Sequence, residues 1–296
     1  MGNKAAGKES RLMGFLSRKA DYLMVFPAVI WMAIFLFIPI IIIIVTSFYT
    51  LVGYTPQPIF TLKNYATVLF APHYQSIILF TLKLAFQVTA VCFIIGFPAA
   101  YFMATRIKSN AVQTLIILVL LIPFWIDWTV RTIAWYPLLG KIGLINMVLM
   151  STGLVSEPLG MLMQSEFSAT LAMVEAYLLF MIAPIFLSMN RIEPGYIQAA
   201  ESLGANRFRA FYEVIWKLSL PGVAIGWMFV FVMGMADFAT PNLLGGTIQT
   251  IGGSTAYAVG ILNWPLAGAF GAVLIIITFA VVFIILKLVD VRSMLF

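Results

Sequence analysis

Long apolar stretches alternate with short polar segments along most of the chain. The apolar stretches cover about 22–49, 76–104, 111–130, 167–190, 218–238 and 264–288. A helix that crosses a bilayer needs roughly 20 mainly apolar residues, and each stretch meets that requirement. The pattern therefore predicts an all-α integral membrane protein with six transmembrane helices.

Two parts of the pattern need separate interpretation. The segment 142–155 is apolar but shorter than a span and is flanked by glycines, which favours a re-entrant or interfacial piece. The first stretch, 22–49, is too long for the core of a signal peptide and lacks a small-residue cleavage pattern, so we interpret it as a retained span. The chain then divides into a basic cytoplasmic N-terminal arm, 1–21, and a transmembrane domain, 22–296.

The charges along the chain predict its orientation. Hydrophobic residues make up 62% of the chain and charged residues only 9%, while the net charge is +6. Most of the 17 Lys and Arg residues fall on segments that are cytoplasmic if the N-terminus is inside. Because basic loops are retained on the cytoplasmic side of membranes, we expect both termini in the cytoplasm. This bias explains the positive charge without nucleic acid as a partner.

The single histidine, His73, and the single cysteine, Cys92, limit the chemistry of the chain. One cysteine forms no intrachain disulfide, and one histidine makes no His-based metal cluster. We expect Cys92 to pack in a helix and His73 to lie in a loop. The same shortage disfavours a membrane hydrolase or transferase. A glycine–lysine pattern at Gly2–Ser10 fails as a phosphate-binding loop, because Glu9 replaces Ser or Thr and no strand precedes it.

The stretch between the fourth and fifth spans, 191–217, is polar and rich in helix-forming residues. Apolar residues recur there mostly three or four positions apart, at Ala200, Leu203, Phe208, Phe211, Val214 and Ile215. Gly204 suits the left-handed residue that ends a helix, and Asn206 is placed to cap a second one. The pattern predicts a short helix, a sharp turn and an amphipathic helix that leads into the fifth span. An interfacial helix lying on lipid fits the pattern equally well.

Motifs in this loop and around it resemble those of a known family. The segment QAAESLGANRFRAFYEVIWKLSLPG is similar to the cytoplasmic EAA loop of binding-protein-dependent ABC importer permeases, with Ala199, Ala200 and Gly204 at the motif's positions. The motif's leading glutamate is Gln198 here, and Lys217 stands at its usual first proline. IPFWIDWTVRTIAWYPLL resembles a segment of the permeases for spermidine, putrescine and opines. GLINMVLMSTGLVSEPLGMLM and ADFATPNLLGG resemble segments that follow in that subfamily.

The resemblance implies a type I ABC importer permease with the MetI-like fold, in a bacterial inner membrane. The loop would couple the chain to a cytoplasmic ATPase through Gln198, Ala199, Ala200, Glu201, Leu203, Gly204, Arg207, Phe208 and Arg209. Such a permease works with a dimer of ATPase subunits, a second permease, and a periplasmic or lipid-anchored solute-binding protein. ATP and Mg then bind to the ATPase, so we expect no cofactor and no catalytic residue in this chain.

Ionisable residues inside spans are candidates for the solute path, because a charge is costly in hydrocarbon unless it faces protein or water. The candidates are Glu175, Asp237, Asp127 and Lys83, with the aromatic residues Trp125 and Trp128 near Asp127. Three acids and one base favour a cationic solute, in agreement with the polyamine-type resemblance. Two structural alternatives remain. In the first, Asp127 pairs with Arg131, four residues on, and only holds local structure. In the second, the tryptophans form a belt at the outer membrane interface.

Two questions stay open on sequence alone. A stand-alone ion-coupled transporter or channel is the main alternative function, which inverted repeats and several buried charges on one helix would favour. The sequence has scattered charges and no clear repeat. Gly222 and Gly226 form a G-x-x-x-G pattern that allows close helix contact, although in a chain with 21 glycines chance explains the pattern about as well.

Overall fold

The computed structural model describes residues 26–288, so the predicted basic arm at 1–21 lies outside the described residues. Within them, six helices are long and apolar enough to cross a membrane. They cover Phe26–Ser47, Pro72–Arg106, Trp128–Ser151, Gly160–Met189, Arg207–Ala236 and Trp264–Lys287, and Asn110–Trp125 is a shorter apolar helix. The predicted class, a helical membrane protein with six spans, is confirmed.

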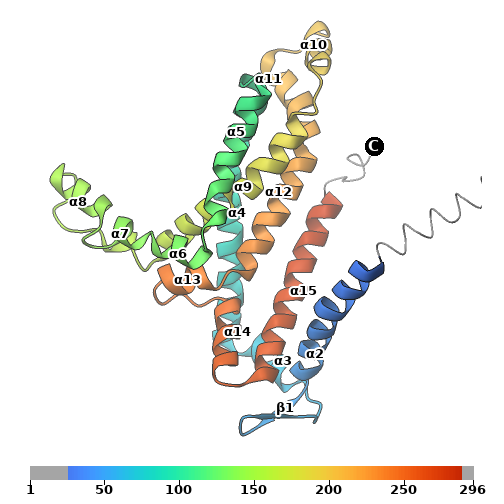
Figure 1. Ribbon diagram of the computed structural model, residues 1–296, viewed down its shortest axis with the longest axis vertical. Coiled ribbons are helices and arrows are strands. Elements are labelled where there is room, and N and C mark those ends of the chain that lie inside the picture. Colours follow the sequence, from blue (N-terminus) through green and yellow to red (C-terminus); the bar gives the residue numbers. More distant parts are fainter. Residues whose placement is uncertain (1–25, 289–296) are drawn as a thin grey trace, which may run out of the picture.

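The segment Trp128–Ser151 does not coincide with the predicted third span, 111–130, which corresponds instead to the shorter apolar helix Asn110–Trp125. Residues 128–151 are divided among three short helices, α6 (Trp128–Ile133), α7 (Tyr136–Leu139) and α8 (Leu144–Ser151). These helices extend sideways from the bundle in Figure 1, and α8 occupies the segment predicted as re-entrant or interfacial. The helix that stands within the bundle is α5 (Asn110–Leu121), continued by the 3-10 turn η2 (Ile122–Trp125). It ends before residue 130 because Asp127 caps the next helix.

The remaining elements follow in chain order. The first span contains the π-helical turn η1 (Ala33–Phe37) and α2 (Ile38–Ser47), and it is followed by an antiparallel hairpin, β1 (Thr50–Val52) and β2 (Thr55–Gln57). Next come α3 (Lys63–Phe70), α4 (Pro72–Arg106), the 3-10 turn η3 (Gly160–Leu162) and α9 (Glu166–Met189). The last part holds α10 (Pro194–Ser202), α11 (Arg207–Ala210), the π-helical turn η4 (Phe211–Trp216), α12 (Lys217–Ala236), α13 (Ala239–Leu244), α14 (Ile251–Gly260) and α15 (Trp264–Leu288). The two strands of the hairpin are three residues each, and the rest of the regular structure of residues 26–288 is helical.

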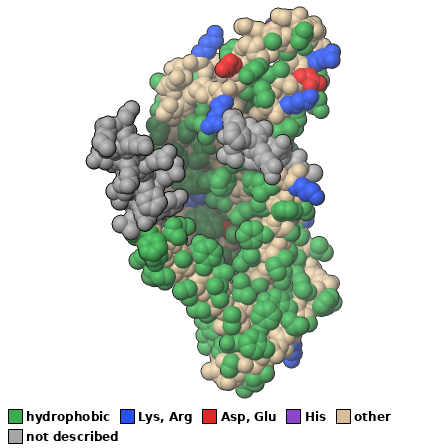
Figure 2. All heavy atoms as spheres, turned by 90° about the vertical axis from the view of Figure 1, so that its right-hand side faces the viewer, with side chains coloured by type: hydrophobic (Ala, Val, Ile, Leu, Met, Phe, Trp, Pro, Cys, Tyr) green, Lys and Arg blue, Asp and Glu red, His purple; other side chains and the backbone are tan. Residues whose placement is uncertain are grey.

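The long helices alternate in direction through the bundle. In Figure 1, α4, α9 and α15 run toward the end that carries α10 and α11, whereas α5 and α12 run away from it. Most of the Lys and Arg side chains visible in Figure 2 lie near that end, and the surface below them is mainly hydrophobic. Large apolar side chains of the first span, such as Trp31 and Phe35, are exposed. Such a surface fits contact with lipid or with neighbouring subunits.

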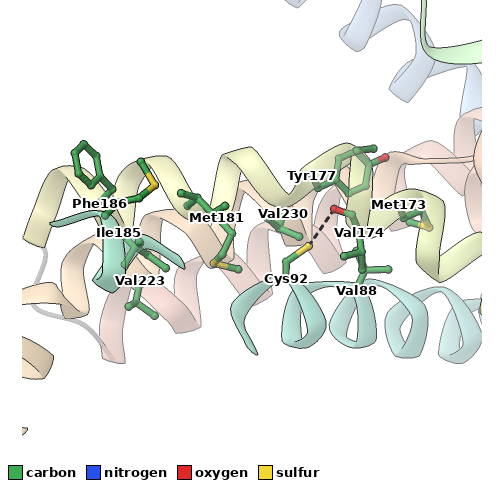
Figure 3. Packing of buried hydrophobic residues seen from close by; sticks show 14 of the residues in the cluster. Val88, Cys92, Met173, Val174, Tyr177, Met181, Ile185, Phe186, Val223 and Val230 are labelled. Atoms are coloured by element: carbon green, nitrogen blue, oxygen red, sulfur yellow. Dashed lines mark hydrogen bonds between the residues drawn. The ribbon is translucent and has the colours of Figure 1, made fainter. Parts of the chain in front are cut away.

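Helices α4, α9 and α12 supply most of the main apolar core. Their facing sides interdigitate through Val88 on α4, Val174 on α9 and Val230 on α12 (Figure 3). The Cys92 thiol donates to the carbonyl of Val174, with 3.8 Å between sulfur and oxygen, which confirms that this cysteine packs in a helix. His73 lies in the first turn of α4, not in the predicted loop, because Pro72 starts the helix there.

Two glycines allow α12 to approach α9 closely. A Cβ atom built on Gly222 would lie 2.5 Å from the carbonyl oxygen of Pro184 and 2.6 Å from the Cβ of Ser188. A Cβ atom on Gly226 would lie 2.9 Å from the sulfur of Met181. All three distances are shorter than van der Waals contact. The G-x-x-x-G pattern therefore serves helix packing here.

Gly222→Ala tests this contact. The added methyl group would meet the backbone oxygen of Pro184, so we expect the variant to lose about 1–3 kcal/mol of stability and to unfold at a lower temperature in detergent. Gly271→Ala is the matched control, because nothing lies within 4 Å of a Cβ atom at that position. Thermal unfolding followed by size-exclusion chromatography measures both variants. Equal melting temperatures would contradict the close contact.

Candidate functional site

The loop between α9 and α12 folds into a compact two-helix element. α10 ends at Ser202, and Gly204 follows with φ +86°, the left-handed conformation predicted for it. The amide of Gly204 donates to the carbonyl of Glu201 at 2.9 Å, and the amide of Ala205 donates to the carbonyl of Ala200 at 3.0 Å. This pair of bonds is the Schellman motif, which closes a helix at a glycine. The predicted sharp turn is confirmed.

A side-chain cap starts the second helix. The Asn206 side chain accepts a hydrogen bond from the amide of Arg209 at 2.8 Å, as predicted. α11 then continues through η4 into α12 without a break. Because α12 belongs to the core of the bundle, a displacement of this element is carried along a continuous helix into the core.

The apolar residues of this element point in two directions. Leu203 is 89% exposed and Phe208 is 78% exposed. Phe211 instead packs inward, with its ring 5.5 Å from the ring of Tyr101 on α4, and Ile215 is buried. The predicted stripe is therefore divided. Leu203 and Phe208 form an exposed apolar tip, while Phe211 and Ile215 attach the element to the bundle.

Polar and charged residues surround the exposed apolar tip. Ala200 is half-buried, and the other residues expected in the coupling loop are exposed, namely Gln198, Ala199, Glu201, Arg207 and Arg209. A helix lying on lipid presents one continuous apolar face. A small apolar centre with a polar rim is instead the composition of a protein-binding surface.

A groove of about 720 Å³ lies next to this element, between α5, α9 and α12. Its walls are mostly apolar and include Phe180 from α9 and Phe229 from α12. Arg191, Tyr196 and Lys217 line the groove where it meets the loop. Sequence patterns carry no signature of this groove, because its walls come from three helices that are far apart along the chain.

Glu175 lies within α9 and faces Arg131 of α6. The Arg131 Nε lies 3.7 Å from the Glu175 Oε2, and the guanidinium lies 5.3 Å from the centre of the Phe124 ring. The exposed fractions of the two side chains are 14% for Arg131 and 34% for Glu175. Arg131 therefore pairs with Glu175, and the alternative in which it pairs with Asp127 is wrong. The sequence contains one indication of a distant partner: Glu175 lies inside a span and has no basic residue within a turn or two of it.

Asp127 caps α6 instead of pairing with a cation. Its Oδ1 accepts hydrogen bonds from the amides of Thr129 at 2.9 Å and Val130 at 3.3 Å. Free amides at a helix N-terminus stabilise a carboxylate there, so the charge of Asp127 is satisfied locally. Of the two tryptophans near it, Trp125 is exposed and Trp128 is half-buried.

Asp237 is 3% exposed, and its carboxylate is engaged on both oxygens. The Tyr177 hydroxyl donates to Oδ2 at 2.7 Å, and the amide of Thr240 donates to Oδ1 at 3.0 Å. These bonds tie the end of α12 to α9 and to the start of α13. Sequence reasoning missed Tyr177: a buried tyrosine hydroxyl usually has a hydrogen-bond partner, but nothing in the sequence places it beside Asp237, which is 60 residues further along the chain.

Lys83 on α4 pairs with Glu166 in the first turn of α9. Its Nζ lies 2.7 Å from Oε1 and 2.9 Å from Oε2 of that carboxylate, so the two charges are hydrogen-bonded directly. Among the ion pairs of residues 26–288, only that of Arg131 with Glu175 has no hydrogen bond between the two side chains.

Known proteins resemble the chain over most of its length. No protein-family model matches it. It is 31% identical over 258 residues to the spermidine/putrescine transport system permease protein PotB of Haemophilus influenzae, covering 86% of this chain and 88% of that protein. It is 32% identical over 271 residues to the inner membrane ABC transporter permease protein YdcU of Escherichia coli, covering 86% of this chain and 85% of that protein.

A solved structure shares the fold. The crystal structure of a bacterial ABC transporter involved in the import of the acidic polysaccharide alginate matches with a TM-score of 0.72 at 18% identity, over 95% of this chain and 98% of that chain. The MetI-like fold implied by the sequence motifs is confirmed by this match. Together with the two relatives, these observations show that the chain belongs to the family of ABC importer permease subunits that includes PotB.

Proposed function

We propose that this chain is one membrane subunit of an ATP-driven importer for small organic cations of the polyamine class. The observation that carries the proposal is the two-helix element α10–α11, which is closed by Gly204, joined to α12 and tipped by exposed apolar side chains. The solute class is supported by the name of PotB, which is 31% identical over most of both chains.

The exposed apolar tip would bind a groove of a cytoplasmic ATPase dimer. ATP and Mg bind to that dimer, and this chain contributes no catalytic residue. When ATP closes the dimer, the element moves as a rigid body and α12 moves with it. The central path then opens outward to receive the solute.

A second permease and a periplasmic or lipid-anchored solute-binding protein complete the proposed assembly. A solved alginate transporter in complex with an alginate pentasaccharide-bound periplasmic protein matches this chain with a TM-score of 0.70, which supports such an arrangement. The basic end of the bundle in Figure 2 would face the cytoplasm of a bacterium. Both termini would then be cytoplasmic, with the chain in the inner membrane.

Glu175 is the acidic residue that we place on the solute path. Asp127 and Asp237 accept hydrogen bonds from the backbone, and Lys83 is held by Glu166. Glu175 is partly exposed and accepts no hydrogen bond from the described residues.

Removing the exposed apolar tip tests the coupling role. We expect Leu203→Ala combined with Phe208→Ala to reduce ATPase recovery in a mild-detergent pull-down about tenfold or more, because central apolar side chains dominate binding at interfaces. Thermal stability should not change, since both side chains are exposed. Phe60→Ala combined with Leu154→Ala is the control, because it removes two exposed apolar side chains that lie outside this loop. Full ATPase recovery by the double variant would contradict the coupling role.

Reconstitution tests the function as a whole. The complex recovered from the native host, placed in liposomes with ATP inside and the binding protein outside, should accumulate radiolabelled putrescine or spermidine. Liposomes without ATP are the control and should show no accumulation. Uptake that is independent of ATP and follows an imposed ion gradient would favour a stand-alone transporter instead.

A further inference from the structure

The ion pair of Arg131 with Glu175 is loosely held. Its closest approach is 3.7 Å, against 2.7 Å for Lys83 with Glu166. Hydrogen bonds from nitrogen to oxygen are about 2.7–3.2 Å long, so the two charges attract each other without a direct bond. The Arg131 side chain is only 14% exposed. Water therefore does little to replace the missing bond.

Both partners have hydrogen-bonding capacity that the fold does not use. The Nη1 atom of Arg131 is buried and has no partner among the described residues. The Glu175 carboxylate likewise accepts no hydrogen bond from residues 26–288. A buried ion pair that serves only stability normally has its remaining donors and acceptors satisfied. The pair therefore leaves a buried donor and an acceptor available to another group.

A row of aromatic rings connects this pair to the groove. The Arg131 guanidinium lies over Phe124, whose ring centre is 5.2 Å from that of Phe180 in an edge-to-face arrangement. The ring of Phe180 is in turn 6.2 Å from that of Phe229. Phe180 and Phe229 both line the groove. Aromatic faces attract organic cations, so the row forms a surface along which such a cation can approach Glu175.

We propose that Arg131 is a tethered cation that occupies a solute site formed by Glu175 and Phe124, and that an alkylammonium group of the solute displaces it. This inference rests on the proposed function. A guanidinium and an alkylammonium ion bind the same carboxylate and the same ring face. While the site is empty, Arg131 prevents Glu175 from being an unpaired charge inside the membrane. When the solute enters, its own positive charge takes over that role.

Direct binding of putrescine tests the proposal. The ATPase–permease complex is purified without its binding protein, and equilibrium dialysis with radiolabelled putrescine gives the Kd. Arg131→Gln should lower the Kd about tenfold, because a site that a competitor occupies most of the time binds its ligand correspondingly more weakly. Glu175→Gln should raise the Kd at least tenfold. A Kd for Arg131→Gln equal to or above that of the unmodified complex would overturn the proposal.

Control variants separate displacement from a structural role. Arg131→Lys keeps a tethered cation and should retain the weak binding of the unmodified complex. Lys83→Gln removes a cation from the other α9 ion pair and should leave the Kd unchanged; a tenfold decrease there would overturn the proposal. Arg131→Met keeps the aliphatic stem and replaces the Gln variant if that variant does not assemble. If neither Arg131→Gln nor Arg131→Met co-purifies with the second permease, Arg131 is an interface residue and the proposal fails.

Uptake by the unmodified complex distinguishes this inference from the proposed function. If that complex accumulates putrescine with ATP but Arg131→Gln does not bind it more tightly, the tethered cation alone is refuted. If the unmodified complex accumulates neither putrescine nor spermidine, the proposed solute class fails, and the displacement of Arg131 by an alkylammonium group fails with it.

Discussion

The close contact between α9 and α12, which Gly222 and Gly226 allow because they carry no side chain of their own, is the constraint on which the other functional features depend. α12 carries the two-helix element α10–α11 at one end and is tied to α9 through Asp237 and Tyr177 at the other. α9 carries Glu175. Because packed interiors transmit displacement and do not absorb it, a displacement of the α10–α11 element would shift α12 against α9 and reach the wall of the groove.

The local features could be predicted from the sequence because short-range rules determine them. Gly204 adopts the left-handed conformation that ends α10, and the Asn206 side chain accepts a hydrogen bond from a free amide at the start of α11. The partner of Arg131 could not be predicted from the sequence. Asp127 lies four residues before Arg131, and this spacing fits an ion pair between them as well as it fits a carboxylate that caps the helix carrying Arg131. Which loop residues face outward also depends on tertiary contacts, here those of Phe211 with α4.

The fold does not determine the charge of the cargo. A protein of the same fold belongs to a transporter of an acidic polysaccharide, whereas the relatives with the higher sequence identity include one named for polyamines. A shared backbone arrangement therefore leaves the chemistry of the solute to a few side chains and to the other subunits. In this chain Asp127 and Asp237 are held by hydrogen bonds and Lys83 by a direct ion pair, so most of the candidate charges already have partners within the fold.

The π-helical turn η4, Phe211–Trp216, has a consequence for the direction in which the exposed apolar tip faces. A π-turn amounts to one extra residue inserted into an α-helix, and one residue of an α-helix corresponds to a rotation of about 100°. The direction in which Leu203 and Phe208 face is therefore set by the number of residues in this turn. Deleting any one of them would rotate Leu203 and Phe208 by about 100° relative to the core that α12 enters.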